Sequence, residues 1–468
     1  MIRGTRVKPL PLLPSGPGGV CSRPLHEARS LTSHRSSYNR DVPFQVRWLV
    51  FACAVTQGLA QDQVQSPGRD PLQVFDQARE RLVQVIRSLP RFTCLETVRR
   101  DYFAPPPAQG HLLAAPAKAN CPDVFLDPSD KNMAASDRLR LEVTVGENRE
   151  IHAWPGADKF DTRPIDEFVD GPISTGGFGG YLVEVFDNPA AHITFVGEKL
   201  NRLEYAYRTP REGSHYYIGR SRVLTGHGGS FQIDPETLDI VSLRIETDPA
   251  PAETGMCRDR TEIDYHRVKI GEGDLVLPIQ SVLQILEPGG RISRATTTFS
   301  ACHEYLAESS IRFDDDAASS STPKRSVASA PLAPGIHFTL RTLASIDLDE
   351  AAAGDRFSAR VTHSSDKKVL PEGTMLSGRI TGVRKFFNMR RTQFAVTLQT
   401  AEIRNASVPV NALGDLRART PPPGFRNRGR EIDLPPPGGS QHEGAFMFPG
   451  DMRVLKAGYE TLWVTTIP

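Results

Sequence analysis

The stretch RLRLEVTV at residues 138–145 decides the fold class. Apolar and polar side chains alternate along it, with Leu139, Leu141, Val143 and Val145 on one face and Arg138, Arg140, Glu142 and Thr144 on the other. A period of two is typical of a β-strand that buries one face and presents the other to water. The stretch therefore predicts a sheet with one apolar face.

The same alternation returns along the chain. It recurs at residues 203–208 (LEYAYR), 215–218, 231–233, 240–247, 262–270, 275–286, 294–305 and 311–313, and residues 92–102 also have the pattern of a strand. Turn chemistry separates these runs at residues 226–229 (GHGG), 234–237 (DPET) and 288–290 (PGG). Short alternating strands joined by turns predict a curved antiparallel sheet, or half-barrel.

Two helices are expected against this sheet. Residues 70–89 have Asp70 as a cap and Pro71 at the first helical position, followed by an apolar stripe of Leu72, Phe75, Ala78, Leu82, Val85 and Leu89. A short inner helix is expected to follow Thr175 as its cap, with apolar side chains at helical spacing: Phe178, Tyr181, Leu182, Val185 and Phe186.

The inner helix is preceded by a glycine-rich run, STGGFGG at residues 174–180. The free N–H groups of such a helix start can bind a phosphate. However, no P-loop lysine is present and no GxGxxG follows a strand. The more frequent role of such a run is a tight loop that lets the helix dock close to the sheet.

The second half of the chain predicts a separate small β-domain. Residues 314–334 have the Asp-, Ser- and Pro-rich composition of a linker. Strands are expected from residue 335 onward, at 336–342, 356–361, 375–383, 393–398, 407–412 and 455–466, with an insertion rich in Pro, Gly and Arg at 415–445. The predicted fold is α+β and mainly β: a half-barrel domain at residues 70–313, then a β-barrel-like domain at 335–468.

Residues 47–60 (RWLVFACAVTQGLA) resemble an export signal, although they start late in the chain. A basic residue precedes a short apolar run, and small residues precede a cleavage site between Ala60 and Gln61. We expect a signal peptide at 46–60 and read residues 1–45 as an over-extended gene start or a disordered leader. The run is too short to span a bilayer. This predicts a periplasmic or secreted protein; lipidation at Cys53, or a cytosolic leader with a buried apolar turn, is the alternative.

Four cysteines remain after the signal: Cys94, Cys121, Cys257 and Cys302. An even number in an exported chain predicts two disulfides. Three pairings are possible, and the short-range choice joins Cys94 to Cys121 and Cys257 to Cys302. Zinc is the rival, but the spacing contains no CxxC, so no metal site is predicted.

Charge and motifs give little support to nucleic-acid binding or to catalysis. The net charge is +1, so the clusters at 384–391 (RKFFNMRR) and 417–430 are interpreted as solvated loops, without nucleic acid as a partner. No GxSxG, HExxH or kinase motif is present, and no cofactor is predicted. His215 beside Ser214, and His303 with Asp264, lack the third partner of a triad.

Aromatic residues cluster around the expected inner helix: Trp154, Phe160, Phe168, Phe178, Tyr181, Phe186 and Phe195. Aromatic side chains most often fill cores. The alternative is an apolar groove between sheet and helices, bordered by Trp154, Phe178, Tyr181 and Phe186.

Six segments together resemble a family of exported bacterial proteins of uncharacterised activity: residues 89–94 (LPRFTC), 137–143 (DRLRLEV), 152–156 (HAWPG), 174–179 (STGGFG), 263–268 (IDYHRV) and 300–313 (SACHEYLAESSIRF). The order of elements is also similar, at the level of topology, to half-barrel lipoprotein-sorting carriers and periplasmic sigma-factor regulators. Residues 370–380 are faintly similar to β-barrel domains of envelope conjugation machinery. No catalytic residue follows from these resemblances.

Two functions are consistent with the sequence. The first is an envelope protein without a catalytic site that binds a lipid, a lipoprotein or a protein partner in the groove. The second is an envelope hydrolase that acts on a glycan or an ester with groups drawn from separate strands.

Overall fold

The computed structural model describes residues 70–105, 121, 128, 132–146, 149–157, 160–161, 163–219, 222–250, 254–304, 326–327, 330–414 and 442–468. Within these ranges the protein consists mainly of antiparallel strands, which confirms the predicted α+β, mainly β class. The leader, the signal with its Ala60–Gln61 site, and most of the predicted linker and insertion lie outside the described residues. None of the helices in these ranges is long and apolar enough to cross a bilayer.

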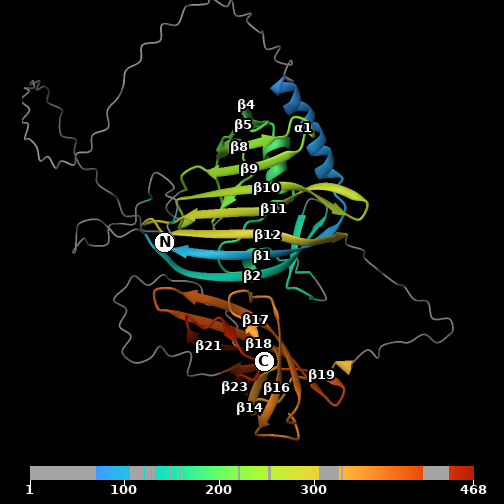
Figure 1. Ribbon diagram of the computed structural model, residues 1–468, viewed down its shortest axis with the longest axis vertical. Helices are drawn as coiled ribbons and strands as arrows, with labels where there is room; N and C mark the ends of the chain where they lie inside the picture. The colour runs from blue at the N-terminus through green and yellow to red at the C-terminus, as the bar shows by residue number, and fades with distance from the viewer. Residues whose placement is uncertain are drawn as a thin grey trace, which may run out of the picture. The chain divides into compact units, whose positions relative to one another are not determined.

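A curved sheet forms the first half, and its strands pair in the order β4–β5–β8–β9–β10–β11–β12–β1–β2 (Figure 1). The strands are β1 (Phe92–Phe103), β2 (Met133–Gly146), β4 (His192–Lys199), β5 (Arg202–Thr209), β8 (His227–Ile233), β9 (Ile240–Thr247), β10 (Arg258–Ile270), β11 (Gly273–Leu286) and β12 (Ile292–Glu304). Strand β3 (Arg149–Ala153) pairs with the second half of β2. All these pairings are antiparallel, as the alternation predicts.

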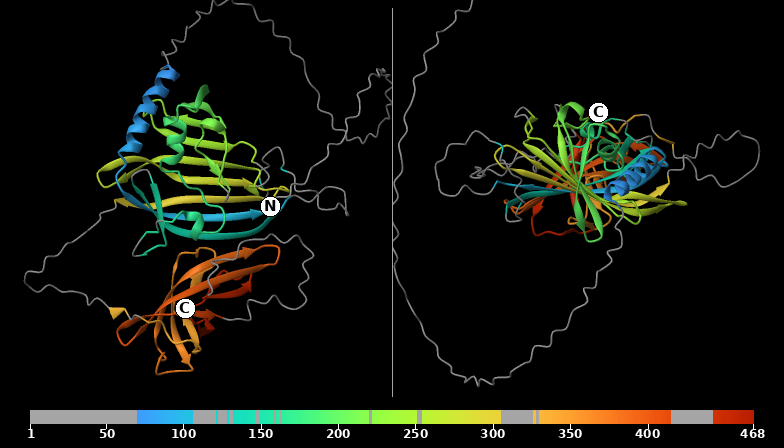
Figure 2. Two further views of the ribbon diagram at one scale, coloured as in Figure 1. Left: turned by 180° about the vertical axis from the view of Figure 1, so that it is seen from behind. Right: turned by 90° about the horizontal axis from the view of Figure 1, so that it is seen from above.

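The period-two pattern explains which face of the sheet is buried. In β2, Leu139, Leu141 and Val143 are buried, whereas Arg138 and Arg140 stay partly exposed. The sheet is strongly twisted when seen from above (Figure 2), as expected from the right-handed twist of strands.

Helix α1 (Pro71–Arg87) packs on this sheet near β5 and β8 (Figure 2). Asp70 accepts a hydrogen bond from the Leu72 N–H at 3.0 Å, which confirms the predicted cap. Phe75 is buried against Phe186 and Phe231, while Leu72 is exposed, because Val74, Ala78 and Ile86 complete the buried face instead.

The inner helix begins later than predicted. It consists of α3 (Gly180–Leu182) and a π-helical turn, η2 (Val183–Asp187), and its cap position is Gly179. The predicted Thr175 cap is therefore wrong: residues 175–179 form an extended loop and turn before the helix. The remaining short elements of this half are α2 (Ile165–Phe168), η3 (Arg211–Gly213), β6 (Tyr217–Ile218) and β7 (Val223–Leu224).

The second half forms a closed barrel. Its strands pair in the circular order β14–β16–β17–β18–β21–β20–β23–β14. They are β14 (His337–Thr342), β16 (Arg356–Ser364), β17 (Met375–Phe386), β18 (Arg391–Ile403), β20 (Ala412–Gly414), β21 (Glu443–Pro449) and β23 (Glu460–Thr465), with β13 (Ser326–Val327), β15 (Ile346–Asp347), β19 (Ala406–Pro409) and β22 (Val454–Leu455) outside the ring. Inside, Trp463 lies so close to Gly444 that a Cβ there would meet its ring at 2.3 Å, so this position requires glycine.

Strand β17 also pairs with β2 and brings a buried ion cluster with it. Arg384 lies opposite Asp137 in this pairing. Asp137 accepts hydrogen bonds from Arg100 Nε at 2.6 Å and from an Arg384 Nη at 2.7 Å, and the three side chains are at most 7% exposed. Burial acts to lower the pKa of Arg100, but the Asp137 carboxylate outweighs it, so the pKa is raised.

The hydrophobic core consists of several clusters. One cluster is formed by residues from Leu332 to Trp463, whereas the others are formed by residues from Val74 to Ala295, with Ala353 in one of them. The boundary at 314–334 remains a prediction, which limited proteolysis of the full chain would test.

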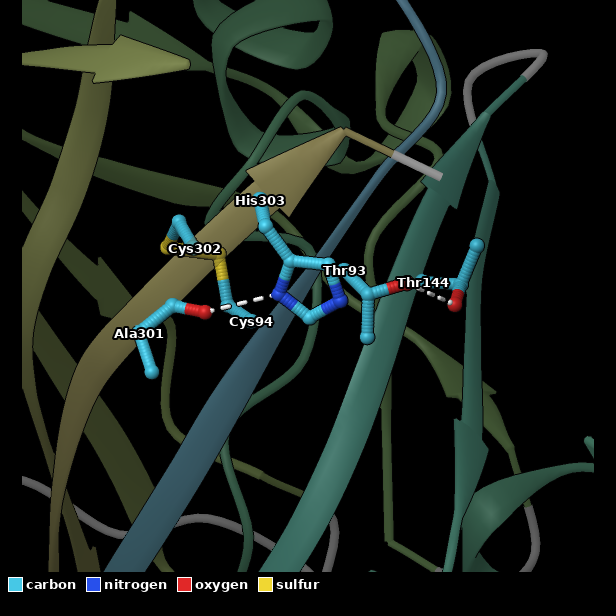
Figure 3. Close-up of a disulfide and its surroundings, with 6 residues drawn as sticks. All are labelled: Thr93, Cys94, Thr144, Ala301, Cys302 and His303. Atoms are coloured by element: carbon cyan, nitrogen blue, oxygen red, sulfur yellow. Dashed lines mark hydrogen bonds between the residues drawn. A yellow bond between two sulfur atoms is a disulfide. The ribbon is translucent and has the colours of Figure 1, made fainter. Parts of the chain in front are cut away.

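The four cysteines form two disulfides, but the predicted pairing is wrong. Cys94 bonds to Cys302, and Cys121 bonds to Cys257. The first bond joins β1 to its neighbour β12 at a bulge, where Ala301 has a positive φ and its carbonyl contacts His303 Nδ1 at 3.0 Å (Figure 3). The short-range pairing is wrong because the neighbour of β1 in the sheet is β12, which carries Cys302, 208 residues after Cys94.

We expect non-reducing peptide mapping to recover the peptides of Cys94 with Cys302 and of Cys121 with Cys257. Replacing both Cys94 and Cys302 by serine should lower the free energy of unfolding by about 2–4 kcal/mol, because the bond closes a long loop. A Cys94–Cys121 peptide, or a double variant as stable as the wild type, would contradict the assignment.

We expect Asp137→Ala to destabilise the protein by about 3–5 kcal/mol, because it leaves two buried guanidinium groups without their carboxylate. Asp161→Ala is the matched control: it removes the partly exposed partner of the exposed Arg163 and should cost under about 1 kcal/mol. Urea denaturation measures both. An equal decrease in the free energy of unfolding in the two variants would contradict a larger contribution from the buried cluster.

Candidate functional site

A cavity of about 460 Å³ lies between β2, α2, β17 and β18, and we call it the β2–β17 pocket. Its walls are formed by Arg100, Asp137, Arg138, Leu139, Trp154, Glu167, Phe168, Val169, Asp170, Ala353, Arg379, Ile380, Thr381, Gly382, Val383, Arg384, Thr397 and Gln399. This volume falls within the ~300–1,000 Å³ range of small-molecule sites.

One part of the wall is apolar. Trp154 and Phe168 meet edge to face, with ring centroids 6.1 Å apart, and Leu139, Val169, Ile380 and Val383 complete the surface. Phe168 is held in place by α2, a single turn after Pro164 that closes with a bond from the Val169 N–H to the Ile165 carbonyl. The apolar part of the wall is therefore built on strands and one closed helical turn.

Arg379 is the unusual cation of this wall. One of its Nη atoms donates to the backbone carbonyls of Pro155, at 3.2 Å, and Gly354, and its guanidinium lies 5.9 Å from the ring centre of Trp154. Burial lowers its pKa, and so does neighbouring Arg356. Within the described part of the chain it makes no ion pair, and its buried Nε has no hydrogen-bond partner.

Thr397 lies directly opposite Arg379 in the pairing of β17 with β18. Its hydroxyl is also buried and has no hydrogen-bond partner among the described residues. Side chains opposite each other on paired strands have Cβ atoms ~4.5–5.5 Å apart. The pocket thus holds two adjacent polar groups whose bonding capacity is unused, which is unusual in protein interiors.

The four residues predicted to border an apolar groove do not lie together. Trp154 lines the β2–β17 pocket, whereas Phe178 packs between Phe92 and Phe299 in another cluster. Phe186 and Tyr181 belong to the cluster under α1; Phe186 is 1% exposed there, and Tyr181 stacks on Tyr216 at 5.8 Å. Phe178 and Phe186 fill the core in the structure.

The glycine-rich loop does bind an anion, but the anion is the protein's own. The N–H groups of Gly176 and Phe178 donate to the Glu150 carboxylate at 2.7 and 3.1 Å. Burial raises the pKa of Glu150, and these two bonds oppose the rise. Next to it, His152 lies 3.3 Å from the buried Glu96, so the loop helps to hold a buried acid–base group.

The predicted catalytic candidates are also separated. His215 contacts the Glu184 carboxylate at 3.1 Å, and the same carboxylate contacts the buried His227, which Tyr207 meets on its other side. Burial acts to raise the pKa of Glu184, but bonds from His227 and His215 lower it.

His303 contacts only a backbone carbonyl among the hydrogen bonds described, while Asp264 lies on β10, which β11 separates from the β12 strand of His303. Across the described ranges, no group of three or more His, Cys, Asp or Glu residues could hold a metal ion.

Sequence reasoning missed Arg379, Thr397 and Asp137 as pocket residues. Arg379 and Thr397 lie in stretches that were predicted as strands, and Asp137 directly precedes the alternating stretch 138–145. The available signal was a charged or polar side chain on the outer face of a barrel strand. It becomes informative only when another strand is known to cover that face.

Comparison with protein-family models finds no match, and no curated protein is significantly similar. Two solved structures are similar over half of the chain: a LolA superfamily protein from Nitrosomonas europaea, covering 50% of this chain and 94% of its own, and a DUF1329 family protein from Desulfovibrio piger, covering 51% and 95%. Each is 11% identical, with a TM-score of 0.24. A likeness at this level carries no argument about fold or function.

The interior of the curved sheet predicts a pH effect on stability. Burial raises the pKa of Asp259 to about 7, although a hydrogen bond with Thr247 opposes the rise. The unfolded chain releases this proton near pH 4, while the folded protein keeps it up to about pH 7. As far as this group determines it, the free energy of unfolding is therefore highest below about pH 4, decreases as the pH rises to about 7, and then stays level.

We expect Asp259→Asn to remove this loss and to stabilise the protein by on the order of 2–4 kcal/mol at pH 8, with little effect at pH 4. Asp264→Asn, at an exposed position of the same strand, is the control and should leave the pH profile unchanged. Thermal unfolding from pH 4 to pH 8 measures this. An unchanged profile in Asp259→Asn would refute the assignment.

Proposed function

We propose that the protein is a non-catalytic binding protein of the cell envelope that holds a small, largely apolar molecule in the β2–β17 pocket. The observation that carries the proposal is the cavity itself, with its wall of Leu139, Trp154, Phe168 and Val169. Burying one methylene group of a ligand contributes ~0.8 kcal/mol, so an apolar ligand of this size gains enough to bind.

The disulfides support an envelope location, because such bonds persist in oxidising compartments. The ligand class retained from the sequence is a lipid or the acyl part of a lipoprotein. Of the predicted groove residues, Trp154 alone lies on this pocket, so the proposal places the ligand there and not between the sheet and the inner helix.

The chemistry of the pocket favours binding over hydrolysis. A hydrolase of this kind needs a carboxylate or an imidazole held inside its cavity. Of the three carboxylates in the wall, Asp137 has both oxygens committed to Arg100 and Arg384, and Glu167 and Asp170 lie at exposed positions. The histidines of the acid–base groups, His152 and His227, do not line this cavity.

A cavity-filling substitution tests the proposal. Val169→Phe adds a ring to the pocket wall and should weaken binding of the neutral dye Nile red at least about tenfold, since the ring takes the space of the ligand. Dye fluorescence gives the affinity, and circular dichroism verifies the fold.

The matched control is Val196→Phe, the same change at an exposed position of β4, which should bind the dye like the wild type. Failure of the wild type to bind Nile red, or equal affinity in Val169→Phe, would overturn the proposal.

A further inference from the structure

We propose that the ligand of the β2–β17 pocket is an amphipathic anion, and that Arg379 binds its carboxylate head group. This inference rests on the proposed function, since it names the class of ligand that the same pocket takes. It depends on the charges, burial and hydrogen bonds of the pocket wall.

Three of the four guanidinium groups in the wall have anionic partners. Arg100 and Arg384 share the carboxylate of Asp137, and Arg138 pairs with Glu350. Arg379 alone has no ion-pair partner among the described residues. A ligand with a negative head group would therefore meet one available cation, not four.

One nitrogen of Arg379 is available to a carboxylate. Its Nη1 is engaged by two backbone carbonyls, whereas no hydrogen bond to the described residues involves Nε or Nη2. Nε is buried and closed to the cavity, so Nη2 is the nitrogen that can donate a charge-assisted hydrogen bond to a carboxylate there.

The energetics also favour an anion in this position. Burial and the neighbouring Arg356 lower the pKa of Arg379 by more than the nearby carboxylates of Glu142 and Asp355 raise it, so this cation is held at a net cost. An anionic head group beside Nη2 would offset that cost. Glu167 and Asp170 also line the pocket, but both are exposed, so they do not neutralise the guanidinium of Arg379.

The rest of the wall determines the other end of the ligand. The wall has an apolar part formed by Leu139, Trp154, Phe168, Val169 and Val383, beside polar residues that include Glu167 and Gln399. An alkyl chain on the carboxylate would be buried against the apolar part.

The experiment compares dodecanoate with dodecanol, which has the same chain and a neutral head group, by calorimetry on the full-length exported chain at pH 8. The wild type should bind dodecanoate more tightly. Arg379→Gln should weaken dodecanoate binding about 10- to 100-fold, the loss expected for charge-assisted bonds, and change dodecanol binding less than about threefold. Arg379→Lys should lie between, because it keeps the positive charge but not the position of the guanidinium nitrogen.

Arg341→Gln is the matched control, since Arg341 is an exposed arginine of the same barrel that pairs with Glu460. It should leave both affinities unchanged. Thr397→Val, nearly equal in volume to the wild-type residue, should leave dodecanoate binding unchanged, because the Thr397 hydroxyl is buried and closed to the cavity. The unfolding temperature of each variant separates loss of binding from loss of fold.

The outcomes separate the two proposals. Equal wild-type affinity for dodecanoate and dodecanol, or an Arg379→Gln variant with an unchanged preference, overturns the anion site but leaves an apolar pocket. Binding of neither molecule, nor of Nile red, overturns the proposed function itself. Dodecyl phosphate is a further probe: if it binds more tightly than dodecanoate, the head group that the site prefers is a phosphate and not a carboxylate.

Discussion

The buried carboxylate of Asp137 is the interaction on which the rest of the structure depends. It lies on β2, the last strand of the curved sheet, and it binds one arginine from β1 and one from the barrel strand β17. A buried charge of this kind tolerates little displacement, because its partners must keep both distance and direction. It therefore fixes the register in which the barrel strand meets the sheet, and the β2–β17 pocket is formed beside it.

The strand alternation could be predicted from the sequence, because a period of two depends only on which face of a strand meets water. The helix at residues 71–87 could be predicted for a similar reason: its cap, its proline and most of its apolar stripe are local signals. Closure of the barrel was expected only in outline. It depends on the short contact between β20 and β21, a pairing too brief to leave a pattern in the chain.

The features that were missed depend on distant parts of the chain. The disulfide partners of Cys94 and Cys121 are set by strand order, which the spacing of cysteines does not encode. The aromatic residues were correctly seen as a group in sequence, yet Phe178 and Phe186 enter different cores, because the turn at the inner helix directs them apart. The role of Arg379 in the pocket depends on Thr397 opposite it and on the residues of β2 in the same wall, and no local sequence pattern reveals either neighbour.

The position of β1 has a consequence for the order of assembly. This strand is the first of the described strands in the chain, but it lies in the interior of the sheet, between β2 and β12. Until β12 has been synthesised, one edge of β1 has no partner, and an unpaired strand edge is prone to bind other chains. The arrival of β12, about 200 residues later in the chain, is therefore the event that ends this exposure.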